Sequence, residues 1–217
     1  MTAAIPFEHT YAQALPDLSQ EWSAAPAREP RAVIVNDELA RDLGLDPDRL
    51  RSEDGLALLT GAVSGPTYAQ AYSGHQFGQF SPVLGDGRAL LLGELVDPHG
   101  KRHDLHLKGS GRTPFSRGGD GKAPLGPMLR EHLLGEAMHA LGIPTTRGLA
   151  VVTTGERIQR SGPDPEPGAI LTRVAASHLR VGTFEFAATQ RSLETRQELI
   201  DYAIQRHWPA AASAANP

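Results

Sequence analysis

The chain has 217 residues, a net charge of −4 and no cysteine. This length suits one large domain or two small ones. The absence of cysteine excludes disulfides, zinc–cysteine sites and a cysteine nucleophile, and it leads us to expect a cytoplasmic protein. The slightly acidic balance and the lack of an 18-residue apolar run lead us to expect no nucleic-acid or membrane partner. The first 18 residues show no cationic segment followed by an apolar run, so we expect no secretory signal.

The first half of the chain predicts an arm, short helices and short strands. Residues 1–30 are rich in Pro and Ala, and we expect them to form an arm that lies on the fold. Next come a predicted strand at 32–35, helices that begin at Asn36, Asp46 and Ser52, short β segments between 68 and 81, a tight turn at 85–87 and a buried strand at 88–95. The polar residues before each helix are typical N-caps, because their side chains can accept a hydrogen bond from the first turn.

Residues 104–131 are the most informative stretch. Polar and apolar residues alternate at 104–108, which predicts a strand with Leu105 and Leu107 facing a core. A loop rich in glycine and cations follows, and such a loop can cradle phosphates. A helix with an apolar stripe then runs from about Pro124 to Leu141. A strand lysine, Lys108, followed by a helix glutamate, Glu131, is the layout by which kinases hold nucleotide phosphates. An ordinary strand–loop–helix with an exposed lysine and glutamate explains the same spacing.

The second half predicts more strands and a final helix. Three strands are expected at 147–152, 157–159 and 169–175, residues 181–187 are ambiguous, a helix begins at Ser192, and a low-complexity tail covers 209–217. Strands before and after one central helix indicate an α+β fold with a mainly antiparallel sheet.

Other site types fit the sequence poorly. Gly121-Lys122 is not a P-loop, since Ala123 stands where Ser or Thr is required. The histidines have no carboxylates at a known metal-ligand spacing, so we expect no metal site, and His106 is expected to face a cleft or the sheet surface.

Five blocks of residues are distinctive in combination. They are QAYSGHQFGQF at 70–80, LGDGR at 84–88, LKGSGRTP at 107–114, SRGGDG at 116–121 and EAMHALGIPTTR at 136–147. Together and in this order they resemble the selenoprotein O family, also called YdiU. The resemblance covers the chain from about residue 5 to Trp208.

The resemblance implies a protein-kinase-like (pseudokinase) fold and a nucleotidyltransferase activity. Members transfer AMP from ATP to Ser, Thr or Tyr hydroxyls of protein substrates, with Mg²⁺ or Mn²⁺, and some are described as transferring UMP. The residues that the resemblance assigns to nucleotide binding are Gly85, Gly87, Arg88, Lys108, Asp120, Gly121, Arg173 and Arg180. Glu131 is implied as the ion-pair partner of Lys108.

One departure from the family is large. Family members are roughly twice as long, and the segment that supplies their catalytic base and metal ligands has no counterpart here. We therefore expect an arm at 1–30, a kinase-like N-lobe at 31–208 and a disordered tail at 209–217, with the catalytic C-lobe absent. Such a half is expected to be inactive alone and to expose an apolar patch. The alternative is a non-catalytic nucleotide-binding or interaction module.

Overall fold

The computed structural model describes residues 5–160 and 162–212, and its largest feature is an antiparallel sheet. Within the described residues, eight strands form this sheet in the order β1-β3-β6-β7-β10-β9-β2, with β8 paired to β10. The strands are β1 (Ser19–Glu21), β2 (Arg31–Val35), β3 (Tyr68–Gln70), β6 (Ala89–Val96), β7 (Arg102–Lys108), β8 (Ala123–Pro124), β9 (Arg147–Ile158) and β10 (Glu166–Ala175). A separate hairpin consists of β4 (Gly74–Gln76) and β5 (Gln79–Ser81). The predicted α+β class with a mainly antiparallel sheet is confirmed.

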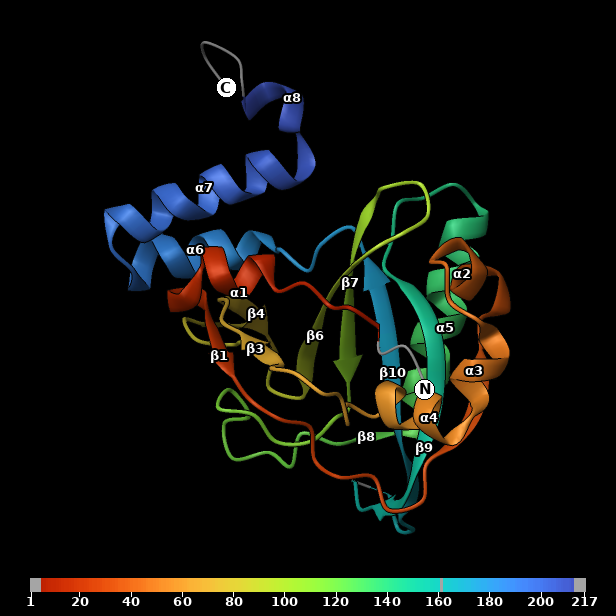
Figure 1. Ribbon diagram of the computed structural model, residues 1–217. Coiled ribbons are helices and arrows are strands. Elements are labelled where there is room, and N and C mark those ends of the chain that lie inside the picture. The colour runs from red at the N-terminus through yellow and green to blue at the C-terminus, as the bar shows by residue number, and fades with distance from the viewer. Residues whose placement is uncertain (1–4, 161, 213–217) are drawn as a thin grey trace.

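Helices lie on both faces of the sheet. They are α1 (Thr10–Ala14), the 3₁₀ helix η1 (Pro16–Leu18), α2 (Asp37–Asp42), α3 (Pro47–Arg51), α4 (Glu53–Leu59), α5 (Leu125–Ala140), α6 (Val181–Gln190), α7 (Leu193–His207) and α8 (Pro209–Ala212). Figure 1 shows α6 and α7 beside α1 at one end of the fold, with α2, α3 and α4 gathered near β9 at the other. No helix among the described residues is both long and apolar enough to cross a bilayer.

Several helices begin where the sequence predicts. The side chains of Asn36, Asp46, Ser52 and Ser192 each accept a hydrogen bond from a backbone N–H in the first turn of α2, α3, α4 and α7, respectively. The ambiguous residues 181–187 belong to α6. The predicted tail begins with α8, and residues 213–217 lie outside the described residues.

The prediction of two strands at 147–152 and 157–159 is wrong, because β9 runs through both. Thr153 pairs with Ala169 and Arg157 pairs with Pro167, so three residues of β9 lie opposite one of β10. This is a bulge, and Gly155 within it has φ of +76°. The bulge lets the strand continue past a glycine that looks like a break in the sequence.

The two faces of β7 are covered by different elements. Leu105 and Leu107 pack in a core with residues of α2, α3 and α4. On the opposite face, Leu91 packs with Phe186 of α6. Residues of α5, β9 and β10 form a third cluster. Since paired residues of neighbouring strands share a face, α5 and α6–α7 cover opposite ends of one face, with the polar side chains of β7 between them.

Helix α5 does not pack through the apolar stripe predicted for it. Leu133, Leu134, Met138 and Leu141 are exposed, whereas Met128 and Gly135 are buried. Gly135 lies so close to the carbonyl oxygen of Thr146 that a Cβ would be 2.8 Å from it, which lets the helix lie near the sheet. The stripe is therefore an exposed apolar surface.

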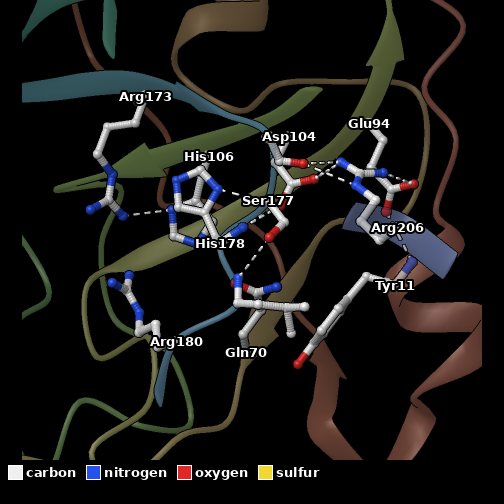
Figure 2. Close-up of polar contacts among 12 residues, drawn as sticks. Tyr11, Gln70, Glu94, Asp104, His106, Arg173, Ser177, His178, Arg180 and Arg206 are labelled. Atoms are coloured by element: carbon white, nitrogen blue, oxygen red, sulfur yellow. Dashed lines mark hydrogen bonds and ion pairs between the residues drawn. The ribbon is translucent and has the colours of Figure 1, made fainter. Parts of the chain in front are cut away.

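Buried charges join the arm and the C-terminal helices to the sheet. Arg206 of α7 donates a 2.7 Å hydrogen bond to Asp104 and lies 3.7 Å from Glu94 (Figure 2). Glu94 in turn accepts hydrogen bonds from the N–H groups of Thr10 and Tyr11, at 3.0 and 2.9 Å. All of these acids are buried, so their charges must be met inside the protein.

Replacing Arg206 should therefore destabilise the fold strongly. We expect Arg206→Leu to lower the free energy of unfolding by about 3–5 kcal/mol, because the buried Asp104 loses its cation and the buried Glu94 keeps only Arg102, at 3.5 Å. The matched control is Arg51→Leu, which removes an arginine paired with Asp37 at the surface and should cost at most about 1 kcal/mol. Urea unfolding followed by circular dichroism measures both, and equal losses would contradict the prediction.

His178 should make stability depend on pH. Burial, together with the neighbouring His106 and Arg173, lowers its pKa to about 3, although Asp104 opposes this shift. His178 is therefore protonated below about pH 6.5 in the unfolded chain but only below about pH 3 in the folded chain. Stability is complete above this window and falls as pH falls, by up to about 1.4 kcal/mol per pH unit for this group.

The measurement compares unfolding free energies at several pH values between 7 and 4. His178→Asn should flatten the decrease seen in the wild type, since it removes this group. His75→Asn, which replaces an exposed histidine of β4, serves as the control and should keep the wild-type profile. A wild-type slope in His178→Asn would show that another group causes the decrease.

Candidate functional site

The site begins with an ion pair between a strand and a helix. Lys108 is the last residue of β7, and its ammonium group contacts the carboxylate of Glu131 on α5. The pair predicted from the sequence is therefore present. Burial lowers the pKa of Lys108; the Glu131 carboxylate opposes this, whereas Arg173 and Arg88 add to it. Lys108 is thus a partly desolvated cation in a cationic neighbourhood.

The buried Arg173 lies beside this pair, and the half-buried Arg180 lies beside Tyr72. Arg173 of β10 has its Nη1 3.6 Å from Glu131 and donates through Nη2 to His106 Nδ1 at 2.7 Å. Arg180, just before α6, places its guanidinium 4.7 Å from the centre of the Tyr72 ring. The Nε atoms of both arginines are buried and have no hydrogen-bond partner among the described residues. These N–H groups are suited to an anion that the protein alone does not supply.

Arg173 and Arg180 share electrostatic neighbours, and Arg88 shares Lys108 with Arg173. Arg173 and Arg180 both act on the pKa values of His106 and Tyr72, and Arg88 acts on Lys108. Only Arg88 among them is exposed. These four cations accompany two carboxylates: Glu131, which Lys108 and Arg173 share, and the buried Asp86. The excess of positive charge favours a ligand with several negative charges.

The glycines assigned by the resemblance shape two loops. Gly85, with φ of +55°, lies against the ring of Phe115, which a Cβ would overlap; Gly87 lies beside it. Gly121, with φ of +68°, lies against the carbonyl group of Gly111 in the same way. Only glycine fits such positions without strain, so both loops present bare backbone.

Asp120 lies apart from the cation cluster in its contacts. Its carboxylate oxygens each accept a 2.9 Å hydrogen bond from Arg160, and one also accepts from the Lys122 N–H. Burial would raise its pKa, but Arg160 and the Lys122 N–H outweigh that effect and lower it. Within the described residues, Asp120 does not contact Lys108, Arg88, Arg173 or Arg180, so its contacts do not place it at the expected nucleotide site.

The expectation that His106 faces a cleft or the sheet surface is wrong. Its side chain is fully buried, because α6 and the segment before it cover this part of the sheet. His106 Nε2 lies 2.8 Å from Asp86 Oδ2, and its ring stacks on His178. Burial alone would raise the Asp86 pKa, but His106, the Gln70 N–H and Arg180 outweigh it and hold the pKa at about 2.

Asp86, His106 and Tyr72 were not expected as parts of the site. Asp86 lies between two assigned glycines, and His106 is on the polar side of β7, which is the only sequence signal for them. Their proximity depends on pairing between distant strands. No single stretch of sequence shows it.

Metal binding is not supported by the residues present. Among residues 5–160 and 162–212, no group of three or more His, Cys, Asp or Glu side chains could hold a metal ion. A triphosphate fits the cation cluster, whereas Mg²⁺ would need oxygen ligands that the described residues do not gather.

The cavities lie on both sides of the sheet. A groove of about 490 Å³ runs between α5 and β9 and includes Glu131 and Arg173 in its lining. A larger cavity of about 800 Å³ lies under α3 and α4 and includes none of the four cations. The chemistry therefore favours the smaller groove as part of the site.

Comparison with known proteins identifies the family. The profile described as "Protein adenylyltransferase SelO" matches residues 2–217. Relatives named "Protein nucleotidyltransferase YdiU" are 57% identical in Mycolicibacterium smegmatis (99% of this chain, 46% of that protein), 58% in Cereibacter sphaeroides (97% and 44%) and 56% in Nitrobacter hamburgensis (99% and 43%). The chain thus spans about half the length of the curated relatives that it matches. A profile match over nearly every residue, with identities this high, shows that the chain belongs to the SelO family.

Proposed function

We propose that this chain is the nucleotide-binding lobe of a protein nucleotidyltransferase that transfers AMP from ATP to Ser, Thr or Tyr hydroxyls of proteins. The observation that carries the proposal is the Lys108–Glu131 ion pair with Arg173 beside it. A strand lysine fixed by a helix glutamate is the arrangement that holds nucleotide phosphates in kinase-like N-lobes. We assign this fold to residues 31–208, with residues 1–30 as its arm.

Each cation has a distinct task in this proposal. Lys108 binds the phosphates as a point charge, and Glu131 keeps its ammonium group in place. Arg173 and Arg180 donate to phosphate oxygens through their free N–H groups, and Arg88 neutralises charge from the exposed side. The backbone at Gly85, Gly87 and Gly121 lets the nucleotide approach closely, and Asp120 orders the loop through Arg160.

The reaction itself needs groups beyond these. ATP supplies an activated α-phosphorus: a substrate hydroxyl oxygen bonds to it, the bond to pyrophosphate breaks, and the hydroxyl proton passes to a base. The described residues provide binding and charge neutralisation, whereas we expect the base and the ligands for Mg²⁺ or Mn²⁺ in the half that the longer relatives possess. The alternative is that this chain only binds nucleotide or another protein.

Lys108→Ala should weaken ATP binding by about tenfold or more, because a charge-assisted contact of about 1.5–3 kcal/mol is lost. Isothermal titration calorimetry with ATP measures the change. The matched control is Lys101→Ala, at an exposed turn between β6 and β7, which should bind ATP as the wild type does. Unchanged ATP affinity in Lys108→Ala would overturn the proposed site.

The chain alone should not transfer AMP at a useful rate. The test incubates it with labelled ATP, Mg²⁺ or Mn²⁺ and an acceptor protein. A chimera in which this chain replaces the matching 46% of the Mycolicibacterium smegmatis relative should label the acceptor. Labelling by the 217-residue chain that disappears in Lys108→Ala would show that the second half is dispensable. A chimera that binds ATP without transfer would favour the non-catalytic alternative.

A further inference from the structure

Three buried side chains, joined by hydrogen bonds, connect the loop at Gly85–Gly87 to Arg173. Asp86 lies between Gly85 and Gly87, His106 lies on β7, and Arg173 lies on β10. His106 joins the other two, with Nε2 2.8 Å from Asp86 Oδ2 and Nδ1 2.7 Å from Arg173 Nη2. Figure 2 shows the His106–Arg173 end of this connection. All three residues are buried.

The contacts determine which ring nitrogen carries the proton. A guanidinium group has donors and no acceptor, so His106 Nδ1 must accept from Arg173. The neutral ring then carries its proton on Nε2 and donates it to Asp86. Asp86 Oδ2 also accepts from the Gln70 N–H at 3.0 Å, which fixes the carboxylate. The direction of both hydrogen bonds of His106 is therefore fixed.

The surroundings keep the ring neutral. Burial lowers the His106 pKa; Asp86 opposes this, and Arg173 and Arg180 act with burial. The ring of His178 stacks on His106 with centroids 4.2 Å apart. A second positive charge here would lie directly against the Arg173 guanidinium, so a neutral acceptor is the form that suits this position.

Arg173 is held from two sides and keeps donors free. Nη2 donates to His106, Nη1 faces Glu131 at 3.6 Å, and Nε has no partner among the described residues. An arginine held in this way loses little side-chain entropy when it binds an anion. The contact with His106 thus fixes the direction of the remaining N–H groups.

We propose that His106 is a positioning residue, which as a neutral acceptor aims Arg173 at the nucleotide phosphates while Asp86 selects its tautomer. This inference rests on the proposed function, because it assumes that Arg173 binds phosphate. It also joins two parts of the site that are distant in sequence: the loop at 85–88, before β6, and Arg173. A shift of this loop would reach Arg173 through His106.

Two substitutions at His106 separate its two contacts. The amide oxygen of His106→Asn takes the place of Nδ1 and can still accept from Arg173. The amide of His106→Gln reaches the place of Nε2, so it keeps the donor to Asp86 but loses the acceptor for Arg173. We expect the ATP dissociation constant of the chain to rise by about tenfold or more in His106→Gln and by only about threefold in His106→Asn.

Two substitutions at Asp86 test whether it fixes the ring. The Gln70 N–H and His106 Nε2 both meet Oδ2 of Asp86, so the amide oxygen of Asp86→Asn takes that place and keeps the proton on Nε2. Asp86→Leu has a similar shape but no acceptor, so the His106 ring loses this contact. We expect Asp86→Leu to lose about as much affinity as His106→Gln, and Asp86→Asn to lose less. The ¹⁵N chemical shifts of the His106 ring should show the proton on Nε2 in the wild type and in Asp86→Asn.

His103 provides a matched control. It lies on the same strand and pairs with Asp97 at 2.9 Å, but it has no contact with the site arginines. His103→Gln should therefore bind ATP like the wild type. Circular dichroism confirms the fold of each variant before titration, and if neither His106 variant folds, the comparison of Asp86→Leu with Asp86→Asn decides.

The outcomes distinguish this inference from the proposed function. If Lys108→Ala binds ATP as tightly as the wild type, the proposed site itself is wrong. If Lys108→Ala weakens binding but His106→Gln and His106→Asn bind equally, or Asp86→Leu keeps wild-type affinity, the positioning role is overturned. A wild-type ring with its proton on Nδ1 would overturn it as well.

Discussion

The middle of the polar face of β7, at Asp104 and His106, has no access to water, and this constraint shapes much of the structure. Asp104 and His106 are buried on that face, so each must find partners inside the protein. The partners come from distant segments. Arg206 lies on α7, Asp86 lies in the loop before β6, and Arg173 lies on β10. One strand thereby determines where both the C-terminal helices and the site arginine must lie.

The same strand carries both structural and functional charge. In its buried part, Asp104 is paired with Arg206. At its end, Lys108 meets a carboxylate that it shares with Arg173, and cations outnumber acids. The structural contact at Asp104 and the proposed binding site at Lys108 thus differ in charge balance and in exposure. The excess of N–H donors at the half-buried end of β7 favours the binding of a multiply charged anion.

Local signals predicted local structure well. The caps at Asn36, Asp46 and Ser52 marked helix starts because capping depends on a few adjacent residues. The strand break expected near Gly155 is absent because pairing with another strand carries β9 through a bulge. Of the site, the Lys108–Glu131 pair followed from their placement on a strand and a helix. The resemblance supplied Arg173 and Arg180.

His106 shows where sequence reasoning failed. Alternation assigned it to the polar face of its strand, which is correct, but that face is covered by a segment whose structure the sequence left ambiguous. The apolar stripe of α5 failed in the opposite direction, since Leu133, Leu134 and Leu141 are exposed and the helix packs through its first turns and Gly135. Periodicity shows which residues share a face, whereas other segments decide which faces are covered.

The docking of the arm has a consequence for the order of folding during synthesis. Thr10 lies within hydrogen-bond distance of Tyr202, and Asp17 accepts hydrogen bonds from Arg191 and Thr195. These contacts join residues near position 10 to residues near position 200, which leave the ribosome later. The arm therefore lacks these partners until α7 emerges. Contacts of such long sequence separation form slowly, so closure of the arm over α7 is a late event in the folding of the chain.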